Sequence, residues 1–66
     1  MKNNLKVLRA IANLSQAELA EKIQVSRQTI NAMELGKYVP STVLALKLAA
    51  VFNKEVGEIF QLEASD

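Results

Sequence analysis

The chain has 66 residues, of which half are hydrophobic, and its eight basic and seven acidic side chains leave a formal net charge of +1. It contains no cysteine and no histidine, which excludes disulfides and the usual structural metal sites. A core this small rarely provides more than about 3–5 kcal/mol of stability, so close helix packing, dimerisation or both must stabilise the fold.

No stretch of the chain looks like a targeting signal or a membrane span. The first residues, MKNNLKVLR, contain no apolar run long enough for a signal peptide, and no later segment could cross a bilayer. The absence of cysteine also suits a reducing compartment, so we expect a cytoplasmic protein that folds as a single domain over residues 1–66. With no glycine-rich phosphate loop, no metal-ligand cluster and no paired carboxylates, we expect no catalysis, cofactor, metal or small-molecule ligand.

A first helix is expected close to the N-terminus. Asn3 or Asn4 can cap it, and the apolar spacing continues to about Ala12. Leu5 and Leu8 lie three residues apart and would form the side that faces the core.

The next 20 or so residues predict two short helices joined by a sharp turn. Ser15 and Glu18 make the S-x-x-E pattern of a capping box, so a second helix should begin at Gln16. Its apolar residues recur at helical spacing and form an inner face: Leu19, Ala20 and Ile23. The pattern breaks at residues 24–26, and Ser26 then caps a third helix.

The third helix has one apolar and one polar face. Ile30 and Met33 form the inner face, and the opposite side carries Arg27, Gln28, Asn31 and Ala32. Two helices that cross at a short turn, the second with a polar outer face, constitute a helix-turn-helix, here over about residues 16–35. In such a unit the second helix lies in the DNA major groove.

Gly36 is expected to end the third helix in a left-handed conformation. After a loop at residues 37–40, Ser41 caps a fourth helix that ends near Asn53. Lys47 is the only charged residue of that helix, and a helix apolar nearly all round is usually buried on several sides.

The C-terminal tail allows two readings. A short fifth helix is expected around Val56–Phe60, although Gly57 weakens it. Because Phe60 and Leu62 alternate with polar residues, the tail can instead form a short strand.

Four phrases of the chain closely resemble the phage-repressor/Cro-like (XRE) family of helix-turn-helix regulators: LSQAELAEKI, VSRQTINAME, GKYVPS and LALKLAAVFN. The resemblance extends from about Leu5 to Leu62. It implies an all-α, compact five-helix, lambda-repressor-like DNA-binding domain. In some small members the tail pairs with the N-terminal residues, which would give a short two-stranded ribbon.

The resemblance also implies which residues meet DNA. Base reading would fall chiefly to Arg27 and Gln28, with Asn31 and Ala32 beside them, although Arg27 could equally contact phosphate. Arginine suits guanine, glutamine or asparagine suits adenine, and alanine can meet a thymine methyl. Further residues are candidates for phosphate contact: Gln16, Ser26, Thr29, Lys37 and Tyr38. Any surface helix has a polar outer face, so the positional match with the family is what favours DNA contact.

A structural ion pair is implied by the same resemblance. In the family an arginine at the position of Arg9 pairs with a glutamate near the end of the recognition helix, here Glu34. Such a pair would lock the first helix to the third. Gln24 departs from the family, because glycine is common at that turn position and a left-handed glutamine is strained.

The distribution of charged and apolar residues along the chain is compatible with two functions. Residues 1–40 carry six basic and three acidic side chains (+3), whereas residues 41–66 carry two basic and four acidic ones (−2). This asymmetry suits a basic end that meets phosphate, but scatter among so few charges explains it equally well. The first function is a DNA-binding regulator, most simply a repressor, acting as a homodimer on an inverted repeat through its C-terminal half.

The second function is a protein-interaction module, such as an antitoxin-like or adaptor protein. It is favoured by apolar residues at positions where the family generally has polar ones: Val7, Ile11, Leu35, Val39, Val43 and Ala50. Clustered apolar surface marks an interface, and Leu35 and Val39 replace side chains that could have contacted phosphate.

Overall fold

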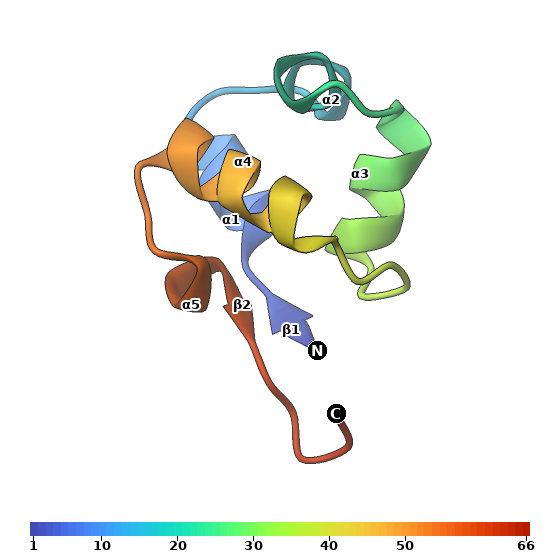
Figure 1. The fold of residues 1–66 in the computed structure, drawn as a ribbon. Helices are drawn as coiled ribbons and strands as arrows, with labels where there is room; N and C mark the ends of the chain where they lie inside the picture. Colours follow the sequence, from blue (N-terminus) through green and yellow to red (C-terminus); the bar gives the residue numbers. More distant parts are fainter.

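Five helices surround one small core, and a two-stranded ribbon joins the two ends of the chain (Figure 1). The computed structural model describes all residues, 1–66. The elements in chain order are β1 (Lys2–Asn3), α1 (Leu5–Ile11), α2 (Gln16–Ile23), α3 (Arg27–Glu34), α4 (Thr42–Phe52), α5 (Val56–Ile59) and β2 (Phe60–Gln61). The predicted five-helix fold is confirmed, with α1 and α5 each ending one residue earlier than the sequence indicated.

Serine caps set the starts of the three longest helices. Ser15, Ser26 and Ser41 all have extended backbones, and each side chain accepts a hydrogen bond from the backbone N–H three residues on. At α2 the Glu18 carboxylate also accepts from the Ser15 N–H at 2.8 Å, which completes the predicted capping box. At α1 the Asn4 side chain makes no cap bond, and Asn3 Oδ1 accepts from the Leu5 N–H instead.

Left-handed residues lie at the ends of α2, α3 and α4. Gly36 follows α3 with φ 74°, as expected, and Asn53 ends α4 with φ 53°. Gln24 ends α2 with φ 61°. This is the left-handed conformation expected at that turn position, where a glutamine is strained. Asparagine tolerates this region far better than glutamine does, so the turn between α2 and α3 contains local strain.

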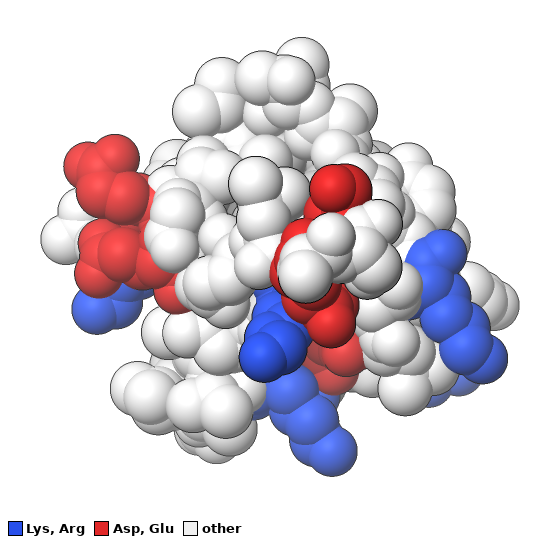
Figure 2. Space-filling view, turned by 90° about the horizontal axis from the view of Figure 1, so that it is seen from below, with Lys and Arg blue, Asp and Glu red and all other residues white.

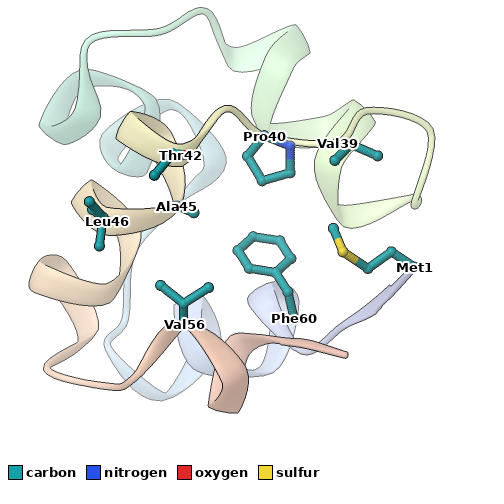
Figure 3. A pocket seen from close by; sticks show the side chains of 8 residues that line it. All are labelled: Met1, Val39, Pro40, Thr42, Ala45, Leu46, Val56 and Phe60. Carbon is teal, nitrogen blue, oxygen red and sulfur yellow. The ribbon is translucent and has the colours of Figure 1, made fainter. Parts of the chain in front are cut away.

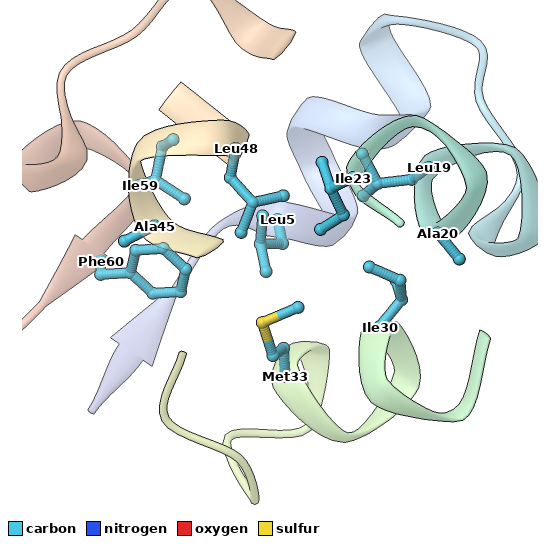
Figure 4. Close-up of a cluster of buried hydrophobic side chains, with 10 residues drawn as sticks. All are labelled: Leu5, Leu19, Ala20, Ile23, Ile30, Met33, Ala45, Leu48, Ile59 and Phe60. Atoms are coloured by element: carbon cyan, nitrogen blue, oxygen red, sulfur yellow. The ribbon is translucent and has the colours of Figure 1, made fainter. Parts of the chain in front are cut away.

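Every helix contributes to the core. The buried side chains are all hydrophobic and form one cluster: Leu5, Leu19, Ala20, Ile23, Ile30, Met33, Ala45, Leu48, Ile59 and Phe60. Figure 4 shows Leu5 and Leu48 near the middle with Met33 below Leu5, the α2 side chains and Ile30 on one side, and Ala45, Ile59 and Phe60 on the other. The inner faces predicted for α2 and α3 are therefore confirmed, and these two helices are held against each other by close packing.

The ribbon links the chain ends antiparallel, with Lys2 opposite Gln61 and Asn3 opposite Phe60. Asn3 also donates from Nδ2 to the Met33 carbonyl at 2.8 Å, which ties the ribbon to α3. The Met1 ammonium lies 2.9 Å from Glu63 and 3.1 Å from Asp66. Hydrogen bonds to these carboxylates raise the pKa of the Met1 amino group above its usual value.

The expectation that α4 is buried on several sides is wrong. Only Ala45 and Leu48 of this helix are buried, whereas the residues Val43 and Leu46 are 62% and 58% exposed. The reason is that α5 and β2 are short and cover one flank of α4 only, and no further layer of structure lies beyond them (Figure 1). No helix is long and apolar enough to cross a membrane.

Candidate nucleic-acid interface

The crossing of α2 over α3 fixes which side of α3 faces outward. Ile30 and Met33 are fully buried against the core, so the opposite side of α3 points away from it. Arg27, Gln28 and Asn31 are exposed there, and Ala32 is half-buried beside them. The structure thus brings the four predicted base-reading residues together on one outward surface.

The predicted phosphate contacts are divided between the two ends of α3. Gln16 begins α2 and Ser26 and Thr29 begin α3, whereas Lys37 and Tyr38 are exposed in the loop that follows α3 (Figure 1). The two hydroxyl groups already serve the helix start, because Ser26 Oγ accepts from the Thr29 N–H and lies 2.9 Å from Thr29 Oγ1. Lys37 and Tyr38 carry no such internal bond from their side chains.

Arg9 and Glu34 form a bidentate ion pair between α1 and α3. Arg9 Nε donates to Glu34 Oε2 at 2.7 Å and Nη2 donates to Oε1 at 3.2 Å, while Nη1 donates to the Leu14 carbonyl at 2.9 Å. The pair is largely removed from water, with side chains 16% and 5% exposed. Burial opposes the charge on Glu34, but hydrogen bonds from Arg9 and Gln16 outweigh it and hold the pKa of Glu34 below its usual 4.5.

A further contact was not predicted from the sequence. The side-chain amide nitrogen of Gln16 donates to Glu34 Oε1 at 3.1 Å and to Asn31 Oδ1 at 3.2 Å. Gln16 therefore connects the Arg9–Glu34 pair to the outward face of α3. The only signal in the sequence was a glutamine at the start of α2 together with a glutamate on the helix that crosses it.

The charges on the face that carries the terminal ribbon are mixed. On this face an acidic group lies at one edge, basic side chains lie at the opposite edge, and both kinds meet in the middle of a mostly uncharged surface (Figure 2). Among the predicted DNA-contact residues, only Arg27 and Lys37 are positively charged. Leu35 and Val39 are exposed beside Lys37, so this border of the surface is apolar.

Comparison with known proteins agrees with this geometry. A family model described as helix-turn-helix matches residues 5–59. An HTH-type transcriptional regulator of Methanocaldococcus jannaschii is 54% identical over 63 residues, covering 96% of each chain. The HTH-type transcriptional regulator YgzD of Bacillus subtilis is 48% identical over the same length and coverage.

A solved structure is also similar. The SOS-response transcriptional repressor LexA of Eubacterium rectale superposes with a TM-score of 0.81 and 28% sequence identity, over 96% of this chain and 67% of that one. Three findings lead to one conclusion. The family model matches five-sixths of the chain, the relatives are transcriptional regulators, and the polar face of α3 points outward. This chain belongs to the XRE-type helix-turn-helix family of DNA-binding transcriptional regulators.

Proposed function

We propose that the protein is a repressor that binds an inverted repeat as a homodimer, with α3 of each protomer in the major groove. The observation that carries the proposal is the row of exposed polar side chains on α3, a helix whose opposite face is fully buried. Arg27 and Gln28 lie at the start of α3 and read bases, with Asn31 and Ala32 further along. Lys37, Tyr38 and the starts of α2 and α3 lie along the phosphates.

Two observations support pairing of two copies through the C-terminal half. A single module of this size buries too little surface on DNA for strong discrimination. Moreover, an open groove of about 240 Å³ lies between the start of α4 and the ribbon, lined mainly by apolar side chains: Met1, Val39, Pro40, Thr42, Ala45, Leu46, Val56 and Phe60. Figure 3 shows the Phe60 ring at its centre, between Val56, Pro40 and Met1.

The exposed apolar residues of α4 continue this surface. Leu46 lines the groove and Val43 lies one turn earlier on α4, and both residues are more than half exposed. Burying such residues against a second copy favours the folded state by mass action. A repressing role is supported by the name of the structural neighbour from Eubacterium rectale, an SOS-response transcriptional repressor.

One specific observation favours the alternative of a protein-interaction module. Val7 and Ile11 are exposed on α1, on a face that neither the groove nor the polar side of α3 includes. If this face binds another protein, the chain would act as an adaptor or antitoxin-like partner.

Selection from random duplexes, followed by sedimentation of the free protein and its complex, tests the proposal. We expect enrichment of an inverted repeat whose half-sites are centred about 34–36 Å apart, two protomers per site, and reduced expression of a reporter whose promoter overlaps that site. A strict monomer in both samples, with one protomer per enriched site, would contradict the homodimer. Absence of any enriched sequence would favour the interaction module.

A further inference from the structure

Leu35 extends the outward face of α3 by about one turn beyond Asn31. It directly follows α3 with a right-handed backbone (φ −81°, ψ −3°), and its N–H donates to the Asn31 carbonyl at 3.0 Å. Seven residues separate Leu35 from Gln28, which is nearly two full helical turns. The two side chains therefore lie one behind the other on the side of α3 opposite its buried residues.

The backbone beyond α3 fixes the position of Leu35 relative to the base-reading candidates. The Gly36 N–H donates to the Met33 carbonyl at 3.0 Å, and the Lys37 N–H donates to the Ala32 carbonyl at 2.9 Å. These bonds close the end of the helix around Leu35. Its place on the outward face is therefore set by the helix and not by the loop that follows.

Leu35 is the one large apolar residue on this face, and no packing within the molecule accounts for it. It is 60% exposed. It belongs neither to the buried cluster nor to the groove between α4 and the ribbon. The residues before it on the same face are polar or, in Ala32, small. An apolar group in this place points to an apolar group on whatever the face binds.

The major groove of DNA displays only one such group. Adenine, guanine and cytosine present hydrogen-bond donors and acceptors there, whereas thymine also presents its C5-methyl group. The eight residues of α3 span about 12 Å, which is close to the groove width of about 12 Å. Leu35 then lies near the edge of the groove, beside the phosphates assigned to Lys37. The C5-methyl group of a thymine is on the side of the base nearest its own backbone, so the two groups can meet.

We propose that Leu35 reads one thymine in each half-site through van der Waals contact with the C5-methyl group. The inference rests on the proposed function and adds a specificity-determining residue to it. Contact removes apolar surface of both partners from water, which favours thymine over a base without the methyl group. A polar side chain that bound phosphate at this position would carry no sequence information, whereas Leu35 discriminates between bases.

Deoxyuridine in place of thymine tests the proposal, because it removes the methyl group and keeps the O4 acceptor. Duplexes from the selection would carry deoxyuridine at one thymine of one half-site at a time, in competition with the unmodified duplex. At one position the wild type should lose about fourfold in affinity, the factor for burial of one methyl group. Leu35→Ala should lose nothing there, while a thymine read by Ala32 should keep its response in that variant.

Two further variants and one further duplex provide the controls. Leu35→Met keeps a long apolar side chain and should retain the response to deoxyuridine. Val7→Ala is the matched control, because Val7 is 58% exposed but lies on α1, so this variant should bind every duplex as the wild type does. With a C·G pair at the responding position, a 5-methyl group on the cytosine should raise wild-type affinity by a similar factor and leave Leu35→Ala unchanged.

An enriched inverted repeat without any thymine whose methyl response depends on Leu35 would overturn the proposal. So would an equal loss of affinity by Leu35→Ala for every duplex, which would mark a contact with the sugar–phosphate backbone. Loss of the dimer by Leu35→Ala in sedimentation would assign the residue to a protein interface instead. If the wild type enriches no sequence at all, the proposed function itself fails.

Discussion

Arg9 and Glu34 are far apart in the sequence, yet they hold α1 against α3 through two short hydrogen bonds. Each single substitution, Arg9→Met or Glu34→Gln, should lower the free energy of unfolding by about 1.5–3 kcal/mol, because it leaves one nearly buried charge without its partner. The double variant should lose less than the worse single variant. A double-mutant cycle in urea measures the coupling, and a coupling near zero would contradict a structural role for the pair.

The same pair gives stability a defined dependence on pH. The pKa of Glu34 is lower in the folded state than its usual 4.5, so the unfolded chain binds the proton more readily. The pair's contribution is therefore complete above that usual value and is lost as the pH falls through the lower folded pKa. Glu34→Gln should remove this part of the acid dependence in urea titrations at several pH values.

Arg27 is the charged residue at the start of α3. Its replacement in Arg27→Ala should lower affinity for the selected site by about 1–3 kcal/mol and relax the preference at one base pair. Lys37→Ala is the control, since loss of a phosphate contact weakens binding evenly across sequences. An even loss with Arg27→Ala, measured by competition between matched and mismatched duplexes, would assign Arg27 to phosphate.

The side chains of the candidate interface were predictable from sequence to different degrees. Periodicity alone put Arg27, Gln28 and Asn31 on one outward face, because helical spacing is a local property. The bond from Gln16 to Asn31 was not predictable in this way. It joins residues 15 positions apart and depends on how α2 crosses α3, which spacing within one helix does not encode.

At the scale of elements, the turn between α2 and α3 contains a residue type that is disfavoured in the backbone conformation the turn requires. Gln24 adopts φ 61°, a conformation that costs most residues about 1–2 kcal/mol. Gln24→Gly should therefore raise the free energy of unfolding by about 0.5–1 kcal/mol, after the greater freedom of glycine in the unfolded chain is allowed for.

Asn53→Gly is the matched control for that substitution. Asn53 has a similar φ of 53°, but asparagine tolerates the left-handed region, so its replacement should change stability less. Thermal and urea unfolding of both variants provide the comparison. Equal effects of the two substitutions would show that glutamine is not strained at this turn.

The helix boundaries followed closely from the sequence because caps are local. The serines at three helix starts and Gly36 at one helix end act on neighbouring backbone groups, so these boundaries can be predicted from short stretches of sequence. The extent to which α4 is buried could not be predicted from the sequence in this way. Whether Leu46 is covered depends on the area that α5 and β2 can shield, and that is a property of the assembled fold.

At the scale of the whole molecule, the position of the apolar surface decides how two copies could pair. Leu46 in the groove and Val7 on α1 are each 58% exposed, so the same substitution can be compared at the two positions. Leu46→Lys should convert the homodimer to monomers in sedimentation, whereas Val7→Lys should leave it intact. The opposite result would place the interface on α1, and no effect from either would contradict the pairing surface proposed here.

The scarcity of positive charge on the outward face of α3 has a consequence for binding in salt. Among the residues proposed to contact DNA, only Arg27 and Lys37 are cationic, so a bound dimer would release few condensed counterions through them. The logarithm of the binding constant should then fall with the logarithm of salt concentration with a slope no steeper than about −3.6 for four such contacts. The protein would read its site mainly through neutral amides, and its affinity would depend less on ionic strength than that of a protein making about six to ten phosphate contacts.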